Sequence, residues 1–268
     1  MIIAQISDPH ITLADGEAEQ RYQTAARLRR AVAHLNGLPA PPDLVLVTGD
    51  CVDSGGELEY ERFRALLRPL RAPVYVVPGN HDDRGLMLRL FGPQGNQALP
   101  GFVQYVVEAQ AVRLIALDTH LPGRDEGLLT EEQLAWLEAR LAEAPTRPTV
   151  IFQHHPPFAT GLAALDRMGL QSADRLCAVL ARHPNVERVL AGHIHCHAQR
   201  RLCGTLAVTC PSTAHQVFVD LRHTERLAVI MEPPACLLHV WRDDIGLLTY
   251  ASPIGDFGPP VEINDEGR

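Results

Sequence analysis

Five short polar clusters bring aspartate, asparagine and histidine close together along the chain. In order they are Asp8-Pro9-His10, Gly49-Asp50, Gly79-Asn80-His81-Asp82, His154-His155 and Gly192-His193-Ile194-His195. In the D-x-H and H-x-H patterns both side chains leave the same side of an extended backbone, so one short loop can bind a cation twice. A glycine before Asp50, Asn80 and His193 allows the backbone to turn sharply and approach an ion. The clusters therefore predict a metal site.

The donor atoms indicate which metals would bind. Imidazole nitrogens are combined with carboxylate and amide oxygens, and the clusters contain no cysteine. Such a set suits manganese, iron, cobalt or zinc better than copper(I) or an iron–sulfur cluster. The chain has 13 histidines but only 5% aromatic residues. This composition favours metal ligands over a surface for stacking bases.

The elements that would position these clusters are visible as apolar runs. Four clusters directly follow predicted buried strands at 2–6, 44–47, 74–77 and 149–152, and the fifth follows Val189-Leu190-Ala191. Helical spacing of apolar residues predicts helices over 21–35 and 57–70, and a capping box of Thr130 and Gln133 opens a third helix. Strands that alternate with helices predict a layered α/β domain. Ligands bind at the carboxyl ends of strands in such sheets, so all five clusters can converge there.

The second half of the chain has a different pattern. Short predicted strands separated by turns follow residue 186, at 188–190, 198–202, 206–210, 216–219, 227–231 and 236–241. We expect this half to be antiparallel and to form a second sheet packed on the first. The tail is rich in proline, glycine and acidic residues. We therefore divide the chain into a domain of residues 1–252 and a C-terminal extension of residues 253–268.

Composition and charge exclude several classes of protein. With 268 residues, 46% of them hydrophobic and 21% charged, the chain can bury a sizeable core and is not a disordered chain. The 32 acidic against 24 basic residues argue against binding of long nucleic acids through their phosphates. No apolar run approaches the roughly 20 residues needed to cross a bilayer, and the first residues do not resemble a signal peptide. We expect a cytoplasmic protein without a membrane partner.

The cysteines carry no readable motif. Six are scattered along the chain without a C-x-x-C pair, at positions 51, 177, 196, 203, 210 and 236. This spacing predicts neither a zinc ribbon nor a dithiol redox site. We expect all six to be buried, reduced thiols.

The five clusters, in their order, resemble the signature of the calcineurin-like metallophosphoesterase superfamily: D-x-H, G-D, G-N-H-[DE], H and G-H-x-H. The resemblance extends over roughly residues 1–216. It implies an α/β (α+β) fold, a four-layer αββα sandwich of two mixed β-sheets flanked by helices, with a centre of two metal ions. These would be divalent or trivalent ions such as Mn²⁺, Fe²⁺/Fe³⁺, Zn²⁺ or Co²⁺.

The same resemblance implies a role for each site residue. One metal would be held by Asp8, His10 and His195. The other would be held by Asn80, His154 and His193, with Asp50 bridging both ions. His81 matches the catalytic histidine of the family, which approaches the phosphate without binding metal.

Departures from the pattern indicate a branch of the superfamily. Protein phosphatases carry G-D-x-x-D-R-G, whereas this chain has Ser54 in place of that arginine and Asp82 at the end of the third motif. The G-N-H-D form and the stretches 153–157 and 211–216 resemble bacterial class III cyclic-nucleotide phosphodiesterases and glycerophosphodiesterases. The resemblance implies hydrolysis of small phosphodiesters, 3′,5′-cyclic nucleotides such as cAMP or glycerophosphodiesters.

A chemical route follows from this set of residues. A hydroxide held between two cations would attack phosphorus, and the small positive charge of the centre suits a singly charged diester. His81 is the candidate general acid for the leaving alkoxide, because an uncoordinated imidazole titrates in the useful range. The residues expected to contact the substrate are Asn80, His81, His195, His197 and His215.

Some neighbouring residues have two interpretations. Asp53 and Asp82 could orient the metal ligands, while Asp82 could instead cap the following helix. His155 is expected to point to the opposite face and to be structural. Alternative functions are a phosphomonoesterase or nuclease of the same superfamily, or a protein-binding scaffold that retains the fold. The expected partner is a small phosphodiester, and the sequence leaves a homo-oligomer open.

Overall fold

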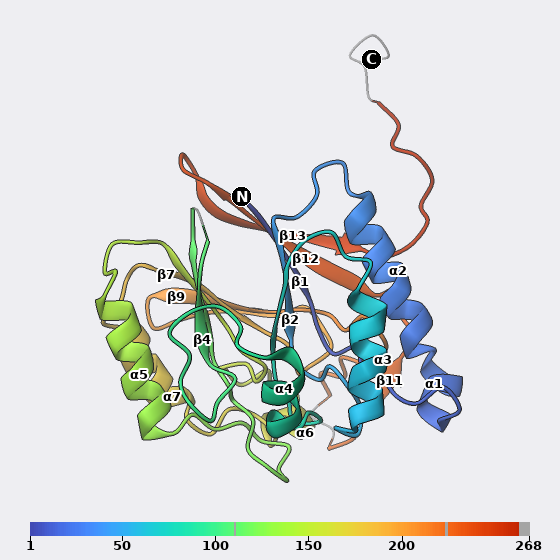
Figure 1. Ribbon diagram of the computed structural model, residues 1–268, viewed down its shortest axis with the longest axis horizontal. Coiled ribbons are helices and arrows are strands. Elements are labelled where there is room, and N and C mark those ends of the chain that lie inside the picture. Colours follow the sequence, from blue (N-terminus) through green and yellow to red (C-terminus); the bar gives the residue numbers. More distant parts are fainter. Residues whose placement is uncertain (110, 223–224, 263–268) are drawn as a thin grey trace.

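The apolar segments pair into two mixed sheets in the computed structural model, which describes residues 1–109, 111–222 and 225–262 (Figure 1). The first sheet has five strands in the order β13-β12-β1-β2-β3. Its strands are β1 (Ile2–Ile6), β2 (Leu44–Thr48), β3 (Val74–Val77), β12 (Ala235–Arg242) and β13 (Gly246–Pro253). Strands β1, β2 and β3 are parallel, and β12 runs antiparallel to both β1 and β13.

The second sheet has six strands in the order β4-β5-β6-β7-β9-β8. They are β4 (Tyr105–Glu108), β5 (Arg113–Ala116), β6 (Thr149–Phe152), β7 (Val186–Ala191), β8 (Gln199–Leu202) and β9 (Thr205–Thr209). The four strands β5, β6, β7 and β9 are parallel, while β4 and β8 close the two edges in antiparallel pairing. Two short strands, β10 (Gln216–Val217) and β11 (Val229–Ile230), pair antiparallel outside both sheets.

Helices cover the outer face of each sheet. The helices that the structure describes are α1 (Glu17–Tyr22), α2 (Thr24–Gly37), α3 (Glu57–Leu67), α4 (Arg84–Phe91), α5 (Glu131–Ala142), α6 (Ala163–Asp166) and α7 (Ala173–Leu180), and four of them form these outer layers. Apolar residues of α2 and α3 pack with the first sheet, and those of α5 and α7 pack with the second. Figure 1 shows these pairs of helices on opposite sides of the two sheets. The four-layer αββα prediction is confirmed.

Local signals in the sequence explain where the helices begin and end. Thr130 Oγ1 accepts a hydrogen bond from Gln133 N (3.3 Å), and Gln133 Oε1 accepts one from Thr130 N (3.0 Å), so the predicted capping box is confirmed. The helix predicted over 21–35 is divided in two, because Gln23 takes a left-handed φ of 52° between α1 and α2. Among the helices described, none is both long and apolar enough for a membrane span.

The prediction of an antiparallel second half is only partly right. Strands β8, β10, β11, β12 and β13 pair antiparallel, whereas β7 is parallel to both β6 and β9. Both β7 and β9 are central strands with apolar residues buried on both faces, which is typical of parallel sheets and carries no mark of direction. The predicted second sheet also differs, since β12 and β13 join the first sheet.

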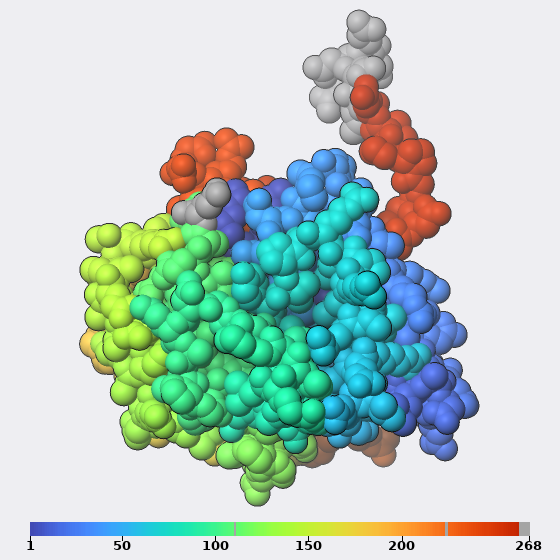
Figure 2. Space-filling model, in the orientation of Figure 1, coloured from blue at the N-terminus to red at the C-terminus, as the bar shows by residue number. Residues whose placement is uncertain are grey.

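The end of the chain leaves the body of the molecule. Ile254, within the predicted extension, is only 4% exposed and packs into the core, so the chain departs after this residue. The described residues from 255 onward are exposed and extend away from the sandwich (Figure 2). The division of the chain at residue 252 otherwise stays a prediction.

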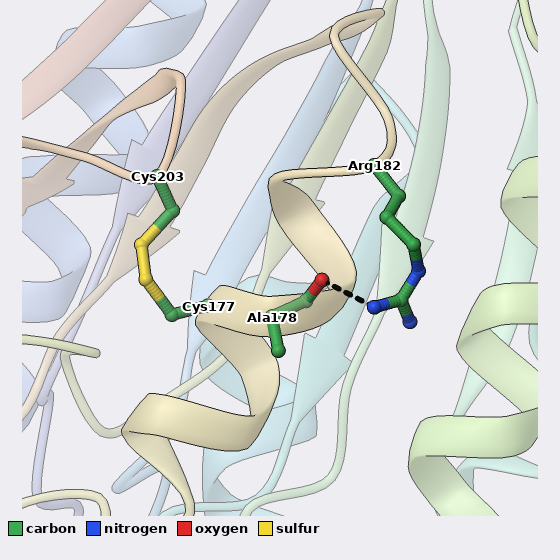
Figure 3. The surroundings of a disulfide bond; sticks show 4 residues. All are labelled: Cys177, Ala178, Arg182 and Cys203. Carbon is green, nitrogen blue, oxygen red and sulfur yellow. Dashed lines mark hydrogen bonds between the residues drawn. A yellow bond between two sulfur atoms is a disulfide. The ribbon is translucent and has the colours of Figure 1, made fainter.

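Two cysteines correct the expectation of six reduced thiols. Cys177 of α7 and Cys203 of the β8–β9 turn form a disulfide with their Cα atoms 5.5 Å apart (Figure 3). Both are half-buried, and the fold brings the helix and the hairpin together at one edge of the second sheet. Cys51, Cys210 and Cys236 are free and buried, and Cys196 is free and half-buried.

Candidate metal centre

The five polar clusters converge at the carboxyl ends of strands from both sheets. Asp8 and His10 follow β1, Asp50 follows β2, and Asn80 and His81 follow β3. From the second sheet, His154 follows β6, and His193 and His195 follow β7. A cavity of about 460 Å³ opens over them. The lining includes Asp53 and seven of the predicted site residues, which are His10, Asp50, Asn80, His81, His193, His195 and His215.

One side of the centre is formed by Asp8, His10, Asp50 and His195. All four are buried, and one donor atom of each lies within 4.8 Å of the others. His10 Nε2 lies 3.1 Å from His195 Nε2 and 3.5 Å from Asp50 Oδ2, and His195 Nε2 lies 3.4 Å from Asp8 Oδ1. The fold thus brings the three predicted ligands of one ion close together, with the predicted bridging residue Asp50 beside them.

The other side is formed around His154. Its Nε2 atom lies 3.1 Å from Asn80 Oδ1, 3.2 Å from His193 Nδ1 and 3.4 Å from Asp50 Oδ2. Asp50 Oδ2 therefore lies within 3.5 Å of a ring nitrogen on each side. This is the position expected for a bridging carboxylate.

The hydrogen bonds of the outer ring nitrogens, those that face away from the centre, determine which ring nitrogen of each histidine carries the proton. In three of the imidazoles this outer nitrogen contacts a backbone carbonyl oxygen, at 2.8 Å in His154 (Thr48), 2.9 Å in His195 (His215) and 3.0 Å in His193 (Met168). A carbonyl only accepts hydrogen bonds, so these outer nitrogens carry the proton. The inner nitrogens then present their lone pairs to the centre, where each can bind a cation or a further proton.

Crowding of these lone pairs shows that the donor set fits metal ions. His10 Nδ1 contacts Asp53 Oδ1 at 3.2 Å, so the inner Nε2 atoms of His10 and His195 face each other at 3.1 Å. Two imidazole lone pairs repel at this distance unless a proton or a cation lies between them. A buried set of carboxylates and inward lone pairs is the chemistry that divalent metals of the manganese-to-zinc series require.

Electrostatics of the buried groups favours positive charge at the centre. Burial by itself would raise the pKa of Asp50, but the imidazoles of His154 and His10 hold it well below its usual value. Burial opposes protonation of His154, yet the charges of Asp50 and Asp8 raise its pKa to about 9. Burial lowers the pKa of His193 and His195 to about 3 in each case. A protonated His154 thus stands beside an ionised Asp50, while the rings of His193 and His195 are neutral.

The backbone is strained where the predicted ligands stand. Eight non-glycine residues among those described take a positive φ, and five of them are Asp8 (50°), His10 (44°), Asp50 (47°), His193 (71°) and His195 (49°). Such conformations cost on the order of 1 kcal/mol or more each and cluster at functional sites. These strained conformations turn the side chains of several loops toward one point.

Three glycines make the close approach possible, as the sequence predicts. A Cβ atom at Gly49 would lie 2.3 Å from His154 Nδ1, and one at Gly79 would lie 2.1 Å from Asp50 Oδ1. A Cβ atom at Gly192 would lie 2.1 Å from Ser7 Oγ. No side chain larger than hydrogen fits at these positions without moving the ligands.

His81 stands beside the centre and is held by Asp53. Its Nδ1 donates a hydrogen bond to the Asp53 carbonyl oxygen (2.7 Å), and its backbone N–H donates one to Asp50 Oδ1 (3.0 Å). The side chain of His81 is 40% exposed and lines the cavity. Its Nε2 atom is therefore the free ring nitrogen of an accessible imidazole.

The other predicted substrate contacts differ from one another. His215 lines the cavity with its ring 4.7 Å from that of His195, and it stacks on Tyr22 at 4.5 Å. His197 is exposed and is absent from the lining of this cavity, so its contact with substrate stays a prediction. Tyr22 and Asp125 also line the cavity, and sequence reasoning did not identify Tyr22.

His155 does not point to the opposite face, contrary to the expectation, and its structural role stays a prediction. Its ring lies 4.5 Å from that of His193. Its Nδ1 contacts Thr119 Oγ1 at 2.8 Å and its Nε2 contacts the Asp125 carbonyl oxygen at 3.1 Å. Both ring nitrogens thus have protein partners, and the ring supports His193 and the loop that carries Asp125.

Known proteins are similar to this chain in sequence and in fold. Residues 1–197 match the family model described as calcineurin-like phosphoesterase. The chain is 35% identical over its whole length to 99% of a probable glycerophosphodiester phosphodiesterase GpdQ from Arcobacter nitrofigilis. It is 32% identical over 81% of its length to 77% of the 3′,5′-cyclic adenosine monophosphate phosphodiesterase CpdA of Pseudomonas aeruginosa.

The fold comparison agrees with the sequence comparison. A crystal structure of a dimetal phosphatase from Danio rerio superposes with a TM-score of 0.65. It is 19% identical, and the match covers 95% of this chain and 99% of that one. This similarity supports the αββα sandwich. With the family model matched from residue 1 to 197 and relatives above 30% identity, the chain belongs to the calcineurin-like phosphoesterase family.

Proposed function

We propose that this protein is a metal-dependent phosphodiesterase that hydrolyses small phosphodiesters in the cavity above the polar clusters. One observation carries the proposal. The buried donor atoms of Asp8, His10, Asp50 and His195 lie close together, and Asp50 also contacts His154 in the second group of predicted ligands. The two relatives described above are named as a glycerophosphodiester and a cyclic-nucleotide phosphodiesterase. We propose the same two kinds of substrate for this chain, glycerophosphodiesters or 3′,5′-cyclic nucleotides such as cAMP.

The proposed cofactors are two metal ions. Asp8, His10 and His195 would hold one ion, and the second would be held by the residues on the other side, with Asp50 shared. The second set consists of Asn80, His154 and His193. When bound, such a pair of cations lowers the pKa of water and neutralises the phosphate oxygens. Manganese, iron, zinc and cobalt all suit the donor set.

His81 is the proposed general acid. Its Nδ1 is held by the Asp53 carbonyl oxygen, so Nε2 is the nitrogen that faces the cavity. In the protonated ring this atom can donate a proton to the leaving alkoxide of a diester, which is a poor leaving group without it. Asp53 thus orients two imidazoles, through its carbonyl oxygen for His81 and through its carboxylate for His10.

The lining of the cavity favours a diester over a more highly charged substrate. Imidazole, amide and carboxylate groups form its floor, and the walls include Tyr22, Leu165, Met168, Val217 and Leu227. No lysine or arginine is found among the described residues that line it. The negative charge of the substrate would therefore be met by the metal ions and imidazoles, which suits one phosphate charge better than two. We propose Asn80, His81, His195 and His215 as substrate contacts.

Hydrolysis of bis(p-nitrophenyl) phosphate tests the proposal. Protein stripped with EDTA should lose at least about 99% of its activity and regain it with Mn²⁺. Cleavage that is indifferent to metal removal would contradict the proposed function. Faster cleavage of p-nitrophenyl phosphate than of the diester would favour the alternative of a phosphomonoesterase. A panel of 2′,3′- and 3′,5′-cyclic nucleotides and glycerophosphoethanolamine would then identify the substrate.

Location and assembly are proposals from the sequence. We propose a cytoplasmic protein, although the Cys177–Cys203 disulfide is unusual for a reducing compartment. Treatment with a thiol alkylating agent before lysis would show whether these two cysteines are oxidised in the cell. Light scattering would show whether the chain forms a homo-oligomer.

A further inference from the structure

A single buried carboxylate connects two loops of the metal centre. Asp82 is 5% exposed and accepts hydrogen bonds from three backbone N–H groups. These belong to Cys51 (3.1 Å), Val52 (3.4 Å) and Gly79 (2.9 Å). The first two follow Asp50 in the loop after β2, and Gly79 precedes Asn80 in the loop after β3. Asp82 therefore ties together the loops that carry two of the proposed ligands.

A buried tyrosine connects the same carboxylate to a helix. The hydroxyl of Tyr60, in α3, donates a hydrogen bond to Asp82 Oδ1 (2.9 Å) and accepts one from Asp83 N (2.7 Å). Tyr60 is fully buried. The helix cap is Asp83, which accepts from Leu86 N at 2.7 Å, so the alternative interpretation of Asp82 as the cap is wrong.

The loops after β2 and β3 are in close contact, so a small shift between them would move the ligands that they carry. Asp50 has a strained φ of 47°, and a Cβ atom at Gly79 would lie 2.1 Å from Asp50 Oδ1. The same oxygen accepts the backbone N–H of His81 at 3.0 Å. A shift of one loop along the other would separate Asp50 from both Asn80 and His81.

We propose that Asp82 and Tyr60 form a clamp that sets the spacing of Asp50 and Asn80, and with it the affinity of the centre for metal. The inference rests on the metal centre of the proposed function. Both clamp residues are positioning residues, since neither lines the cavity. Their effect passes through the backbone of the two loops, whereas Asp53 acts on the imidazoles themselves.

Calorimetric titration of metal-free protein with Mn²⁺ tests the clamp without any turnover. Tyr60→Phe removes the hydroxyl that joins Asp82 to α3, and it should weaken binding of at least one ion by up to about tenfold, the lower end of the loss seen when a group that supports metal ligands is removed. The matched control is Tyr105→Phe. Tyr105 is also buried, and its hydroxyl bonds the Val76 carbonyl oxygen (2.7 Å) and Gln94 Oε1 (3.2 Å), neither of which belongs to a ligand loop. This control should keep Mn²⁺ affinity within about twofold.

Thermal midpoints of both variants show whether they lose similar stability. Unchanged Mn²⁺ affinity in Tyr60→Phe, or an equal loss in Tyr105→Phe, would overturn the clamp. Asp82→Asn places an amide N–H among backbone donors and should weaken binding at least as much; if it does not fold, Tyr60→Phe alone decides. A wild-type chain that binds Mn²⁺ but cleaves no diester would contradict the proposed function and leave the clamp intact.

Discussion

The floor and the rim of the cavity are built differently. The floor consists of strand ends from both sheets that carry the predicted ligands, most of which are buried and five of which take a positive φ. The rim includes α1 and the segment around β10 and β11, where Leu227 is 50% exposed and Val229 is 38% exposed. In the rim, α1 has no buried residue, and β10 and β11 pair at two positions. From this difference we propose that the floor carries the chemistry and that the rim selects the substrate.

The largest expected effect separates chemistry from metal binding within the floor. His81→Ala should lower kcat by roughly 10²–10⁴-fold, because the general acid is lost. The metal content should not change, since the side chain of His81 is 40% exposed at the cavity and is held by the Asp53 carbonyl oxygen. Steady-state kinetics and elemental analysis of the same preparation measure the two effects.

A histidine outside the centre provides the control. His34 bonds Ser252 Oγ at 2.8 Å on the outer side of the first sheet, and His34→Ala should leave kcat unchanged. Loss of both metals in His81→Ala would show that this histidine belongs to the ligand set. Full activity of the variant would remove it from the mechanism.

A second prediction tests how tightly the floor is packed. Gly79→Ala places a methyl group 2.1 Å from Asp50 Oδ1 and 2.5 Å from Asp50 N, where backbone as well as side chain must move. Chemical denaturation should show a loss of about 3 kcal/mol in the free energy of unfolding. Gly37→Ala, at the end of α2 with open space around it, should be neutral or stabilising by about 0.5 kcal/mol. Equal stability of the two variants would contradict the close packing of the ligand loops.

The contrast between floor and rim also explains what the sequence could predict. Asp8, His10 and Asp50 follow apolar strands in spacings that a cation requires, so their convergence follows from local pattern and the rule for strand ends. Tyr22 lies on a six-residue helix, far along the chain from the His215 on which it stacks. No local pattern brings these two residues together. Only the packing of α1 against the centre shows the contact.

For a similar reason the sequence could not predict the direction of strand β7 or the pairing of the two disulfide cysteines. The apolar end of strand β7, residues 189–191, would be equally buried in a parallel or an antiparallel neighbourhood, so the periodicity could not reveal its parallel partners. Cys177 and Cys203 are 26 residues apart on a helix and a hairpin, without a spacing motif. Both features depend on how distant elements meet in space.

A third prediction concerns protons in the floor. Without metal, the raised pKa of His154, about 9 against an ordinary value of 6.5, stabilises the folded protein fully below pH 6.5. That stability is lost as the pH rises through about 9. Metal must displace this proton, so the apparent Mn²⁺ affinity should rise by up to about tenfold per pH unit between pH 6.5 and 8. Calorimetry in buffers of different ionisation enthalpy counts the released protons, and an affinity independent of pH would contradict the raised pKa of His154.

The smallest effect is expected at the rim. Tyr22→Leu removes the ring that stacks on His215 at 4.5 Å but keeps an apolar wall. Loss of a stacked aromatic pair is worth about 0.5–1.5 kcal/mol. KM for a bulky diester should therefore change by about 2- to 10-fold, while kcat and Mn²⁺ affinity stay within about twofold of the wild-type values. A fall in kcat as large as that of His81→Ala would contradict the assignment of Tyr22 to the rim. Such a fall would mean that loss of the Tyr22 ring displaces His215, whose carbonyl oxygen holds the imidazole of His195.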